Sequence, residues 1–392
     1  MFKKIAIISA FTPNNSTAGQ SLTQNLINKL MEKNYFIDLY IIDHRDEDIL
    51  LNHKNLNIVY LKLTKFERII NVLFWIFFLI NPIFSNRFNI FKAYRLHKMI
   101  KEKNYDVVIY NFSQVFLYYL FNRKNKSIFI IHDVIYQLFS RKKGFINKLL
   151  KYMSYINEKI FFNFAYREFV LLNEKDKNLI NNLYGVKGHV GFIILDQNIL
   201  EIDIDKIEVD NTITLFGAWK RKENLQTFVY FFKNIYPYLN NHFKINIIGS
   251  GISEDMIDLV KNYRNVQFIG FVENPYIYIA KSKVLFAVLF EGAGIKVKVL
   301  EALASGTYVV GNEITFEGID IDKGRILYNN DNDCIKIINE IYNTEKEEKK
   351  EIRLSFLEYY NSSKKLDEII QNLIEGKGII NDKCIDGAPV KT

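Results

Sequence analysis

The chain has 392 residues, 49% of them hydrophobic, and a mean hydropathy of −0.05, which predicts a globular protein with two domains of fewer than about 200 residues each. Its formal charge of +8 favours anionic partners; nucleic acid is the weakest, since no zinc-finger or basic-zipper pattern occurs and the 32 Phe and 24 Tyr form no repeating stacking platform. The two cysteines, Cys334 and Cys384, indicate neither a disulfide framework nor a metal cluster and suit a reducing cytoplasm.

The N-terminus superficially resembles a secretory signal, because Lys3 and Lys4 precede an apolar run over residues 5–11. The run is too short and lacks a convincing cleavage site, so a first strand followed by a polar loop and an amphipathic helix explains it better. No stretch of about 18 uncharged residues free of helix breakers occurs, and we therefore expect no transmembrane helix.

Strand-like runs alternate with helical runs through the first half, as in parallel βαβ units. The expected strands are 5–10, 36–42, 57–63, 107–110, 128–131, 169–172 and 190–194.

Between the third and fourth of these strands lies the segment Arg68 to Lys103. It contains an apolar run over residues 72–80 (VLFWIFFLI), followed by the cations Lys92, Arg95, Lys98, Lys101 and Lys103. Apolar aromatics beside cations fit a helix lying in a membrane interface, whereas an ordinary buried helix is the alternative explanation.

A polar stretch over residues 196–211 interrupts the alternation and marks the expected domain junction. The pattern restarts with expected strands at 213–216, 244–248, 266–269, 284–289 and 308–311. We therefore predict domains over 1–195 and 212–355, a helix over 356–375, and a loose tail over 376–392.

The stretch from Glu291 to Gly306, EGAGIKVKVLEALASG, is the strongest local signal. Gly292 and Gly294 let the backbone approach a ligand, and a helix expected to begin near Ile295 points its unpaired amides toward the same place. Two cations, Lys296 and Lys298, add full positive charge. Together these features predict an anion site.

Helical spacing places Glu301 one turn beyond Lys298, where its carboxylate can accept hydrogen bonds from paired hydroxyls such as those of a ribose. An amphipathic helix with a solvated Lys/Glu face explains the spacing about equally well. The surroundings favour a site, because the loop follows the strand expected at 284–289, and open parallel sheets bind ligands at the carboxyl ends of their strands.

The stretch Glu291 to Gly306 closely resembles the nucleotide-sugar loop of group 1 glycosyltransferases, with its glycine turn, basic residues, a glutamate like Glu301 and a small-x-Gly step. The resemblance implies the GT-B architecture, an α/β fold of two doubly wound Rossmann-like domains facing across a cleft. It also implies an acceptor-binding first domain, a nucleotide-sugar-binding second domain and a last helix that crosses back to the first domain. Transfer would retain anomeric configuration and need neither a metal nor another cofactor.

Within this resemblance, Lys298 and a basic residue after Gly217 contact the donor diphosphate. We favour Arg221, because its planar fork matches phosphate oxygens, while the neighbouring Lys220 and Lys222 remain alternatives. A solvated basic turn is the explanation without a site.

Other glycine turns of the second domain also match the family. Gly249 opens a turn near the nucleotide, followed by Ser253 as an expected N-cap, and Val272 lies where family members contact the base through main-chain groups. Plain tight turns explain both positions nearly as well.

The motif also departs from many family members, which carry two glutamates eight positions apart. Eight before Glu301 stands Ala293, and Glu291 is ten before it. The chain thus looks like the branch with a Gly-x-Gly-x-basic-x-Lys loop, and Glu291 is only a secondary candidate for holding the donor sugar.

In the first domain, the family has a glycine beside the donor phosphate and the acceptor at the position of Gly19. His132 ends the strand at 128–131 beside Asp133 and is a candidate for a sugar-hydroxyl contact, although a lone histidine is usually structural. The acidic triplets at 46–48, 203–205, 320–322 and 331–333 resemble metal-binding Asp-x-Asp motifs, but we interpret them as coincidences.

These observations predict a glycosyltransferase that moves a sugar from a nucleotide-diphosphate donor to a lipid-linked or oligosaccharide acceptor in surface-glycan assembly. We expect it at the cytoplasmic face of the plasma membrane, because enzymes that build such glycans often dock through the first domain. A nucleotide-sugar epimerase and a non-catalytic nucleotide-sugar-binding partner are the alternatives.

Overall fold

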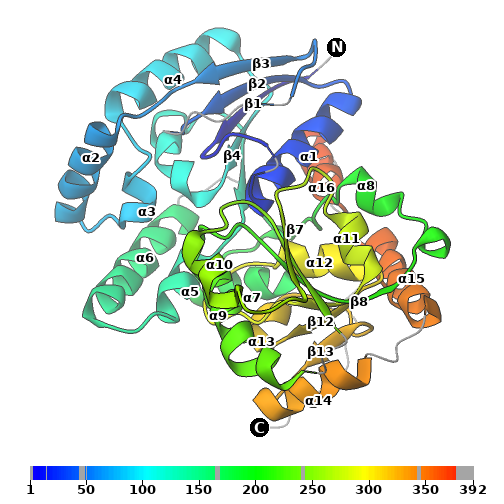
Figure 1. Ribbon diagram of the computed structural model, residues 1–392. Helices are drawn as coiled ribbons and strands as arrows, with labels where there is room; N and C mark the ends of the chain where they lie inside the picture. Colours follow the sequence, from blue (N-terminus) through cyan, green and yellow to red (C-terminus); the bar gives the residue numbers. More distant parts are fainter. Residues whose placement is uncertain are drawn as a thin grey trace.

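The computed structural model describes residues 3–14, 16–43, 49, 51–163, 168–239, 243–341 and 346–376. Three predicted features lie outside these ranges: the acidic triplet at 46–48, Cys384, and the tail beyond Gly376. The described residues form two sheets, each covered by helices (Figure 1).

The first sheet has seven strands in the order β3-β2-β1-β4-β5-β6-β7, all parallel. Its strands are β1 (Lys4–Ser9), β2 (Phe36–Ile41), β3 (Leu56–Tyr60), β4 (Val107–Asn111), β5 (Ser127–Ile131), β6 (Glu168–Leu171) and β7 (His189–Val190). The helices of this part are α1 (Ala18–Glu32), α2 (Lys65–Phe77), α3 (Pro82–Ser85), α4 (Ile90–Lys103), α5 (Ile135–Ser140), α6 (Phe145–Asn163) and α7 (Glu174–Tyr184).

The second sheet has six strands in the order β10-β9-β8-β11-β12-β13, again all parallel. Its strands are β8 (Asp210–Phe216), β9 (Lys244–Ile248), β10 (Val266–Gly270), β11 (Ser282–Phe286), β12 (Tyr308–Gly311) and β13 (Arg325–Leu327). The helices are α8 (Gln197–Leu200), α9 (Lys222–Tyr230), α10 (Glu254–Val260), α11 (Tyr276–Lys281), α12 (Val297–Ala304), α13 (Glu313–Phe316), α14 (Asp331–Ile341), α15 (Lys346–Ser362) and α16 (Leu366–Glu375).

Both sheets are doubly wound. In each, the strand order reverses between the first and fourth strand of the domain, β1 and β4 in one and β8 and β11 in the other. Ligands of such sheets bind at the carboxyl ends of the strands flanking this switch point. The fold therefore directs attention to the loops after these four strands.

Alternation along the strands builds the core of the first domain. Ile5 and Ile7 pack on the α1 side of the sheet, whereas Ala6 and Ile8 pack on the other side, as the period of two requires. The α1-side cluster continues into the second domain through residues of α12 and α15, so one apolar core spans both domains.

The end of the chain returns to the first domain, but not as the single helix predicted over 356–375, because α15 ends at Ser362 and α16 begins at Leu366. Helix α16 packs against α1, and Phe192 pairs with Lys365 in an isolated parallel bridge. Lys33 of the loop after α1 forms an ion pair of 2.6 Å with Asp367 of α16. In Figure 1, α16 accordingly lies beside α1.

Most of the predicted strands are confirmed to within a few residues; one predicted strand is shorter than expected, and one observed strand was missed. The strand expected at 190–194 ends at Val190, because Phe192 pairs with Lys365 beyond the sheet. Strand β13 was not predicted, since its three partly exposed residues form no apolar run.

Candidate active site

The loop after β11, at the switch point of the second sheet, meets the end of β5 in the first domain. Gly294 lies in the loop between β11 and α12, hereafter the donor loop (residues 290–296), and its backbone contacts the end of β5. A Cβ at Gly294 would stand 2.6 Å from the carbonyl oxygen of His132 and would overlap the carboxylate of Asp133. The predicted sites of the two halves are thus brought together.

Helix α12 begins at Val297, two residues later than predicted. Gly294 adopts a positive φ of 67°, and Lys296 is the extended N-cap residue, so neither belongs to the helix. The ammonium of Lys296 donates to the carbonyl oxygen of Gly294 at 2.5 Å and so braces the donor loop. No side chain caps the helix N-terminus, which keeps its partial positive charge directed at the cleft.

Lys298 projects from the first turn of α12 toward the carboxyl end of β8. Its ammonium donates to Asn224 Oδ1 at 3.1 Å and to the carbonyl oxygen of Phe216 at 3.4 Å. Burial lowers the pKa of Lys298 to about 8, and the nearby positive charge of Arg221 contributes to the lowering. Lys298 makes no ion pair among the described residues, although the charges of Glu223 and Glu301 act on it from farther away, so an arriving anion would find a desolvated positive charge.

Asn224 is a site residue that the sequence analysis missed. Its amide nitrogen donates to the carbonyl oxygen of Ala218 at 3.0 Å, which leaves its oxygen to orient Lys298. A Cβ at Gly217 would stand 2.6 Å from the Asn224 amide, so the glycine makes room for it. In the sequence, the only feature that could have pointed to Asn224 is its position seven residues after Gly217.

The three cations after Gly217 separate in the structure. Arg221 is the N-cap residue of α9 and forms an ion pair with Glu223, Lys222 pairs with Glu291 at 3.0 Å, and Lys220 packs against Gly251. Arg221 is close enough to Lys298 and Asp133 to influence the pKa of both.

Glu301 lies on α12 at the junction of the domains. Burial raises the pKa of Glu301 to about 7, a hydrogen bond of 3.3 Å from Tyr276 opposes the rise, and Asp196 adds to it. The carboxyl group borders a narrow space that Ser21 and Asn25 of α1 close from the opposite side.

The remaining predicted positions of the second domain lie at the same edge of the sheet. Gly249 has a φ of 123° and lies so close to the Gly217 carbonyl that a Cβ would overlap it, so only glycine fits there. Val272 is half-buried after β10. The predicted N-cap is confirmed, because Ser253 accepts a hydrogen bond from the amide of Met256.

His132 is held by a chain of hydrogen bonds that fixes its tautomer. Thr23 donates to the Gly19 carbonyl at 2.8 Å and accepts from the amide nitrogen of Asn111 at 2.8 Å. The oxygen of Asn111 must therefore accept from His132 Nε2 at 2.8 Å. Burial lowers the pKa of His132 to about 3, so the ring is neutral and its Nδ1 is a bare acceptor with no partner among the described residues.

Phe112 was also missed by the sequence analysis. Its ring stacks on that of His132 at 3.8 Å, and a Cβ at Gly19 would stand 3.1 Å from the ring. Phe112 has a φ of 75°, a conformation that residues other than glycine rarely adopt and that is found most often at functional sites. The Phe112 ring thus lies between the imidazole of His132 and the start of α1, and it fixes the orientation of the imidazole.

Comparison with known proteins agrees with this fold. Residues 210–343 match the family model described as Glycosyl transferases group 1, and no curated protein matches in sequence. WaaG, a glycosyltransferase involved in lipopolysaccharide biosynthesis, is 13% identical, with a TM-score of 0.66 over 95% of this chain and 100% of its own. HepE from Anabaena, solved in complex with UDP and glucose, is 10% identical, with a TM-score of 0.66 over 95% and 99%. Sucrose-phosphate synthase from Thermosynechococcus elongatus is 13% identical, with a TM-score of 0.64 over 95% and 100%.

The chain has the GT-B fold. The predicted fold class is thereby confirmed: two parallel α/β sheets of Rossmann-like type, with the candidate residues between them. In the GT-B cleft, the first domain supplies the neutral His132 and the second supplies the cations Lys296 and Lys298.

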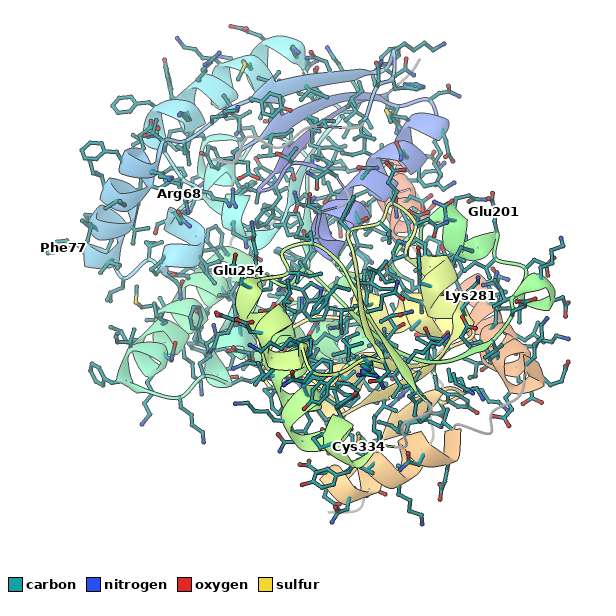
Figure 2. The ribbon with its side chains drawn as sticks, viewed as in Figure 1. Arg68, Phe77, Glu201, Glu254, Lys281 and Cys334 are labelled. Carbon is teal, nitrogen blue, oxygen red and sulfur yellow. The ribbon has the colours of Figure 1, made fainter. Side chains whose placement is uncertain are left out.

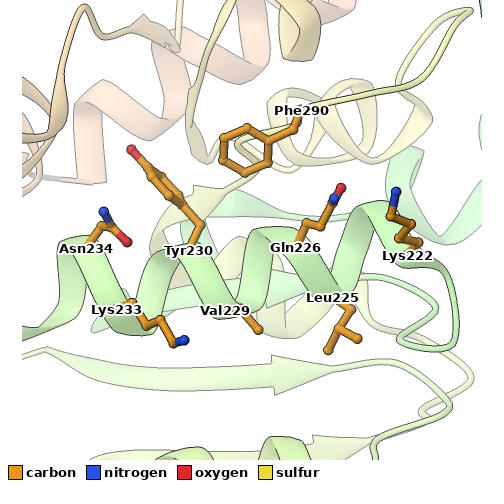
Figure 3. A pocket seen from close by; sticks show the side chains of 8 residues that line it. All are labelled: Lys222, Leu225, Gln226, Val229, Tyr230, Lys233, Asn234 and Phe290. Carbon is orange, nitrogen blue, oxygen red and sulfur yellow. The ribbon is translucent and has the colours of Figure 1, made fainter. Parts of the chain in front are cut away.

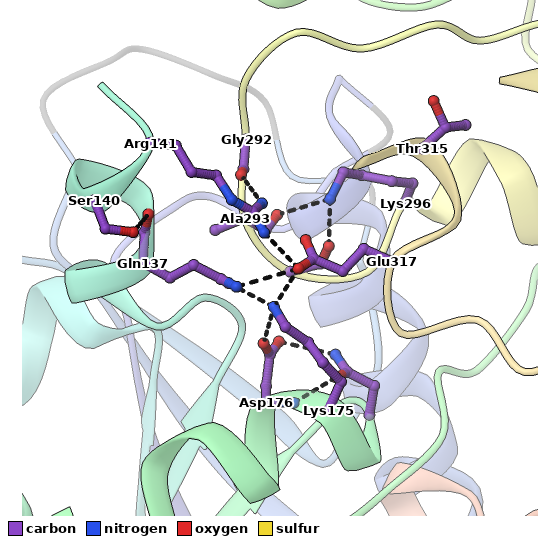
Figure 4. Close-up of polar contacts among 12 residues, drawn as sticks. Gln137, Ser140, Arg141, Lys175, Asp176, Gly292, Ala293, Lys296, Thr315 and Glu317 are labelled. Carbon is purple, nitrogen blue, oxygen red and sulfur yellow. Dashed lines mark hydrogen bonds and ion pairs between the residues drawn. The ribbon is translucent and has the colours of Figure 1, made fainter. Parts of the chain in front are cut away.

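A polar network, also absent from the sequence predictions, joins the two domains beside the donor loop (Figure 4). The carboxylate of Glu317, in the second domain, forms ion pairs with Arg141 and, at 2.8 Å, with Lys175 of the first domain. It also accepts a hydrogen bond of 3.1 Å from the side-chain amide of Gln137. Arg141 also donates to the carbonyl oxygen of Gly292 at 2.5 Å. Burial alone would raise the pKa of Glu317, but the hydrogen bonds from Arg141 and Lys175 lower it to about 2, so this carboxylate stays charged.

An open hollow of about 370 Å³ lies along α9, between Leu225, Tyr230 and Phe290 (Figure 3). It is largely apolar, and the pair formed by Lys222 and Glu291 lies at its end nearest the donor loop. The site residues His132, Lys298 and Glu301 do not line it. We therefore place the candidate active site in the cleft between the domains.

Among the described residues, no group of three or more His, Cys, Asp and Glu side chains is arranged to hold a metal ion. Members of the described acidic triplets make other contacts. Asp203 is the N-cap residue of a short helix, and the carboxylate of Asp331 accepts a hydrogen bond from the hydroxyl of Tyr230.

Proposed function

We propose that this protein is a glycosyltransferase that moves a sugar from a nucleotide-diphosphate donor to an acceptor with retention of anomeric configuration. The observation that carries the proposal is the pairing, across a GT-B cleft, of a desolvated cation at an uncapped helix N-terminus with a neutral histidine whose Nδ1 is free. The match of residues 210–343 to group 1 glycosyl transferases supports it.

The cations have a direct role in such a reaction. As the bond between sugar and diphosphate breaks, negative charge grows on the leaving group, and preorganised charges facing it lower the barrier. Lys298 and Arg221, with Lys296 and the amides of Gly292, Gly294 and Ile295 bordering the site, would meet that charge, and the Gly19 turn would face it from the first domain. The phosphate itself would accept the proton of the attacking hydroxyl.

The remaining candidates would orient the donor. Glu301 would accept hydrogen bonds from both ribose hydroxyls, the turns at Gly217 and Gly249 would flank the nucleotide, and main-chain groups at Val272 would contact the base. His132 would accept a hydrogen bond from a sugar hydroxyl through Nδ1, because Nε2 is already committed to Asn111. HepE, of the same fold, was solved with UDP and glucose, which supports a donor of this kind.

A panel of UDP, GDP and ADP sugars, incubated with and without bacterial lipid extract, tests this function against its alternatives. Transfer predicts release of the nucleoside diphosphate together with a glycosylated acceptor. A nucleotide-sugar epimerase would instead yield an altered nucleotide sugar or free sugar without any acceptor. A non-catalytic partner would bind the nucleotide sugar and leave it unchanged, which would contradict the proposal.

Metal independence follows from a lysine-based mechanism. Because fixed cations replace a divalent ion at the diphosphate, transfer is expected to continue at an undiminished rate in excess EDTA. The rate is measured as nucleoside diphosphate release before and after chelation. Complete loss of activity that magnesium or manganese restores would argue against the mechanism.

Donor affinity should depend on pH through Glu301. Its pKa of about 7 means that the carboxylate, which accepts both ribose hydroxyls, forms only as pH rises through neutrality. We expect the Kd of the nucleoside diphosphate to be lowest between about pH 7 and pH 8, because Lys298, whose pKa is about 8, loses its charge above that range, and to rise roughly fivefold from there to pH 6. Calorimetric titrations across this range provide the measurement.

The variant Glu301→Gln is the matched control for this pH dependence. Its amide keeps one acceptor oxygen but does not titrate, so binding should be weaker at pH 8 and should lose the part of the pH dependence that Glu301 causes. Lys298, whose pKa is about 8, is unchanged in the variant, so any slope that persists belongs to it or to the phosphate. An unaltered slope would remove Glu301 from the nucleotide site.

For the acceptor, we propose a lipid-linked or oligosaccharide glycan reached from the cytoplasmic face of an anionic membrane. No helix in the described part of the chain is long and apolar enough to cross a bilayer, so association would be peripheral. The similarity in fold to WaaG, which acts in lipopolysaccharide biosynthesis, supports a role in surface-glycan assembly.

The surface that would meet the membrane is the outer face of α2, α4 and α6, hereafter the outer face. Phe77 of α2 is 84% exposed, Phe91 of α4 is 81% exposed and Phe145 of α6 is 83% exposed. Figure 2 shows Phe77 projecting outward from the end of α2. The exposed cations nearby on these helices are Lys65, Arg95, Lys98, Lys101, Lys148 and Lys159.

The buried-helix interpretation of residues 72–80 is wrong for most of the run. Leu73, Ile76, Phe77, Phe78 and Leu79 are exposed, whereas Trp75 and Ile80 pack against the core. Hydrogen bonds from Asn81 to the Leu150 carbonyl and from Asn157 to the Leu79 carbonyl, both 3.1 Å, fix the end of α2 against α6. The exposed apolar side chains of α2 and of α6 therefore lie on adjoining parts of the outer face.

Replacing Phe66, Leu73, Phe77 and Phe145 with serine should release the protein from anionic liposomes. These side chains supply burial in the interface, while each cation near the surface contributes about 1 kcal/mol of attraction that added salt should weaken. Trp75 is kept, because its ring packs on Phe88 at 5.5 Å and its loss would disturb the fold. Cosedimentation with liposomes of phosphatidylglycerol and phosphatidylcholine gives the readout.

The control replaces Tyr238 and Leu354, which are both 67% exposed but lie outside the outer face. This variant should bind liposomes like the wild type, and circular dichroism should show both variants folded. A wild-type protein that never sediments with anionic liposomes, at any salt concentration, would end the membrane proposal.

A further inference from the structure

The carboxylate of Asp133 has no role in the proposed function and no partner among the described residues. It follows β5 at the edge of the cleft and is half-buried. Within the described part of the chain it forms neither a hydrogen bond nor an ion pair. Its oxygens still reach solvent, so this open carboxylate beside the glycine turn is available to a ligand group that would displace the water around it.

The surroundings of Asp133 place it beside the reacting end of a donor. Its oxygen lies against Gly294 of the donor loop, and its pKa is affected by the charges of Lys296, Arg221 and Lys175 as well as by Asp176. These cations include the groups that would hold the diphosphate. A sugar attached to that diphosphate would extend from the phosphates toward the first domain, where Asp133 and His132 end β5.

The protonation state of Asp133 suits hydroxyl binding. Burial raises its pKa to about 6, and Lys296 and Arg221 oppose the rise, so the group is mainly ionised at neutral pH. An ionised carboxylate only accepts hydrogen bonds, and its two oxygens can receive two neighbouring hydroxyls of one sugar ring. Asp133 thus offers the kind of contact that a pyranose with adjacent hydroxyl groups requires.

The donor loop itself has no unpaired carboxylate that could accept hydrogen bonds from a sugar. Ala293 stands eight positions before Glu301, and its side chain accepts no hydrogen bond. Glu291 is already paired with Lys222 at 3.0 Å, beside the hollow along α9. Among these positions, Asp133 is the carboxylate that reaches the glycine turn of the loop.

We propose that Asp133 is a specificity-determining residue that accepts hydrogen bonds from hydroxyl groups of the transferred sugar, supplying from the first domain the contact that Ala293 cannot make. This inference rests on the proposed function, because it requires a nucleotide sugar in the cleft. His132 Nδ1 and the two Asp133 oxygens would then bind the sugar from one strand end.

Calorimetry with free UDP, GDP and ADP and with their glucose, galactose and mannose conjugates separates this contact from nucleotide binding. The Asp133→Ala variant should bind the free nucleoside diphosphate within about twofold of the wild type. The preferred nucleotide sugar should bind about ten- to a hundredfold more weakly, as expected for lost hydrogen bonds to a charged group. The matched control Glu291→Gln should bind both probes like the wild type.

Deoxyfluoro analogues of the preferred donor identify the hydroxyls concerned. An analogue lacking a contacted hydroxyl should bind the wild type more weakly but should cause no further loss in Asp133→Ala. Additive losses at every ring position would overturn the proposal, as would loss of sugar affinity in Glu291→Gln alone. A fall in turnover with unchanged sugar affinity would also overturn it, because it would make Asp133 a reacting group.

Failure of this inference differs from failure of the proposed function. If no nucleotide or nucleotide sugar binds the wild type, both fall together. If the wild type binds and transfers but Asp133→Ala keeps its sugar affinity, only the assignment of Asp133 is wrong. Because Asp133 makes no hydrogen bond within the described residues, the variant is expected to melt at the wild-type temperature.

Discussion

Replacing Lys298 with alanine is expected to lower turnover by about two to three orders of magnitude while the fold survives. A preorganised charge opposite a leaving group acts mainly in the transition state, and mutations that remove one such interaction have effects of this size. Lys298 fits this role because it is desolvated, is held by Asn224 and the Phe216 carbonyl, and makes no ion pair in the described part of the structure. Steady-state kinetics should show kcat falling far more than KM rises.

Two controls make the Lys298 result interpretable. Lys233→Ala removes an exposed cation just beyond α9 and should leave turnover unchanged, which tests for a general effect of lost positive charge. Asn224→Ala should lower turnover less than Lys298→Ala, because it releases the ammonium without removing it. If Lys298→Ala keeps wild-type turnover and melts normally, the diphosphate site lies elsewhere in the cleft.

The strands and the glycine loop were predictable because they depend on local patterns. Strands buried on both faces, such as β4 and β5, are continuous apolar runs in the sequence, and a loop at the end of such a strand inherits its position from the sheet. The start of α12 was placed two residues early because spacing alone does not reveal the positive φ of Gly294.

The contacts between the domains could not be predicted in this way. Arg141, Lys175 and Glu317 lie far apart in the sequence, and each alone has the pattern of an ordinary surface charge. The bare Nδ1 of His132 depends on a chain of three hydrogen bonds through Asn111 and Thr23, two residues with no distinctive local pattern. These contacts form only when the chain folds and brings residues that are distant in the sequence together.

The second large effect is expected from Gly294→Ala, which should reduce transfer at least about a hundredfold by keeping the cleft from closing. The new Cβ would stand 2.6 Å from the His132 carbonyl and overlap the Asp133 carboxylate, and the carbonyl cannot move without displacing the end of β5. The nucleotide contacts proposed for Glu301, Gly249 and Val272 do not involve Gly294, so only the contact of its own amide with the diphosphate is disturbed. We therefore expect the free nucleoside diphosphate, measured by calorimetry, to bind less than about tenfold more weakly than in the wild type, while kcat collapses.

Gly185→Ala is the matched control, because Gly185 has nearly the same φ, 68° against 67°, and a Cβ added there would meet no atom within 4 Å. Both substitutions carry the same left-handed backbone strain, of order 1–2 kcal/mol, but only the one at Gly294 introduces a clash between domains. Gly185→Ala should thus lose stability without losing turnover. If the two variants lose activity equally, strain explains the effect. If Gly294→Ala transfers sugar like the wild type, the contact between the donor loop and β5 is not needed for catalysis.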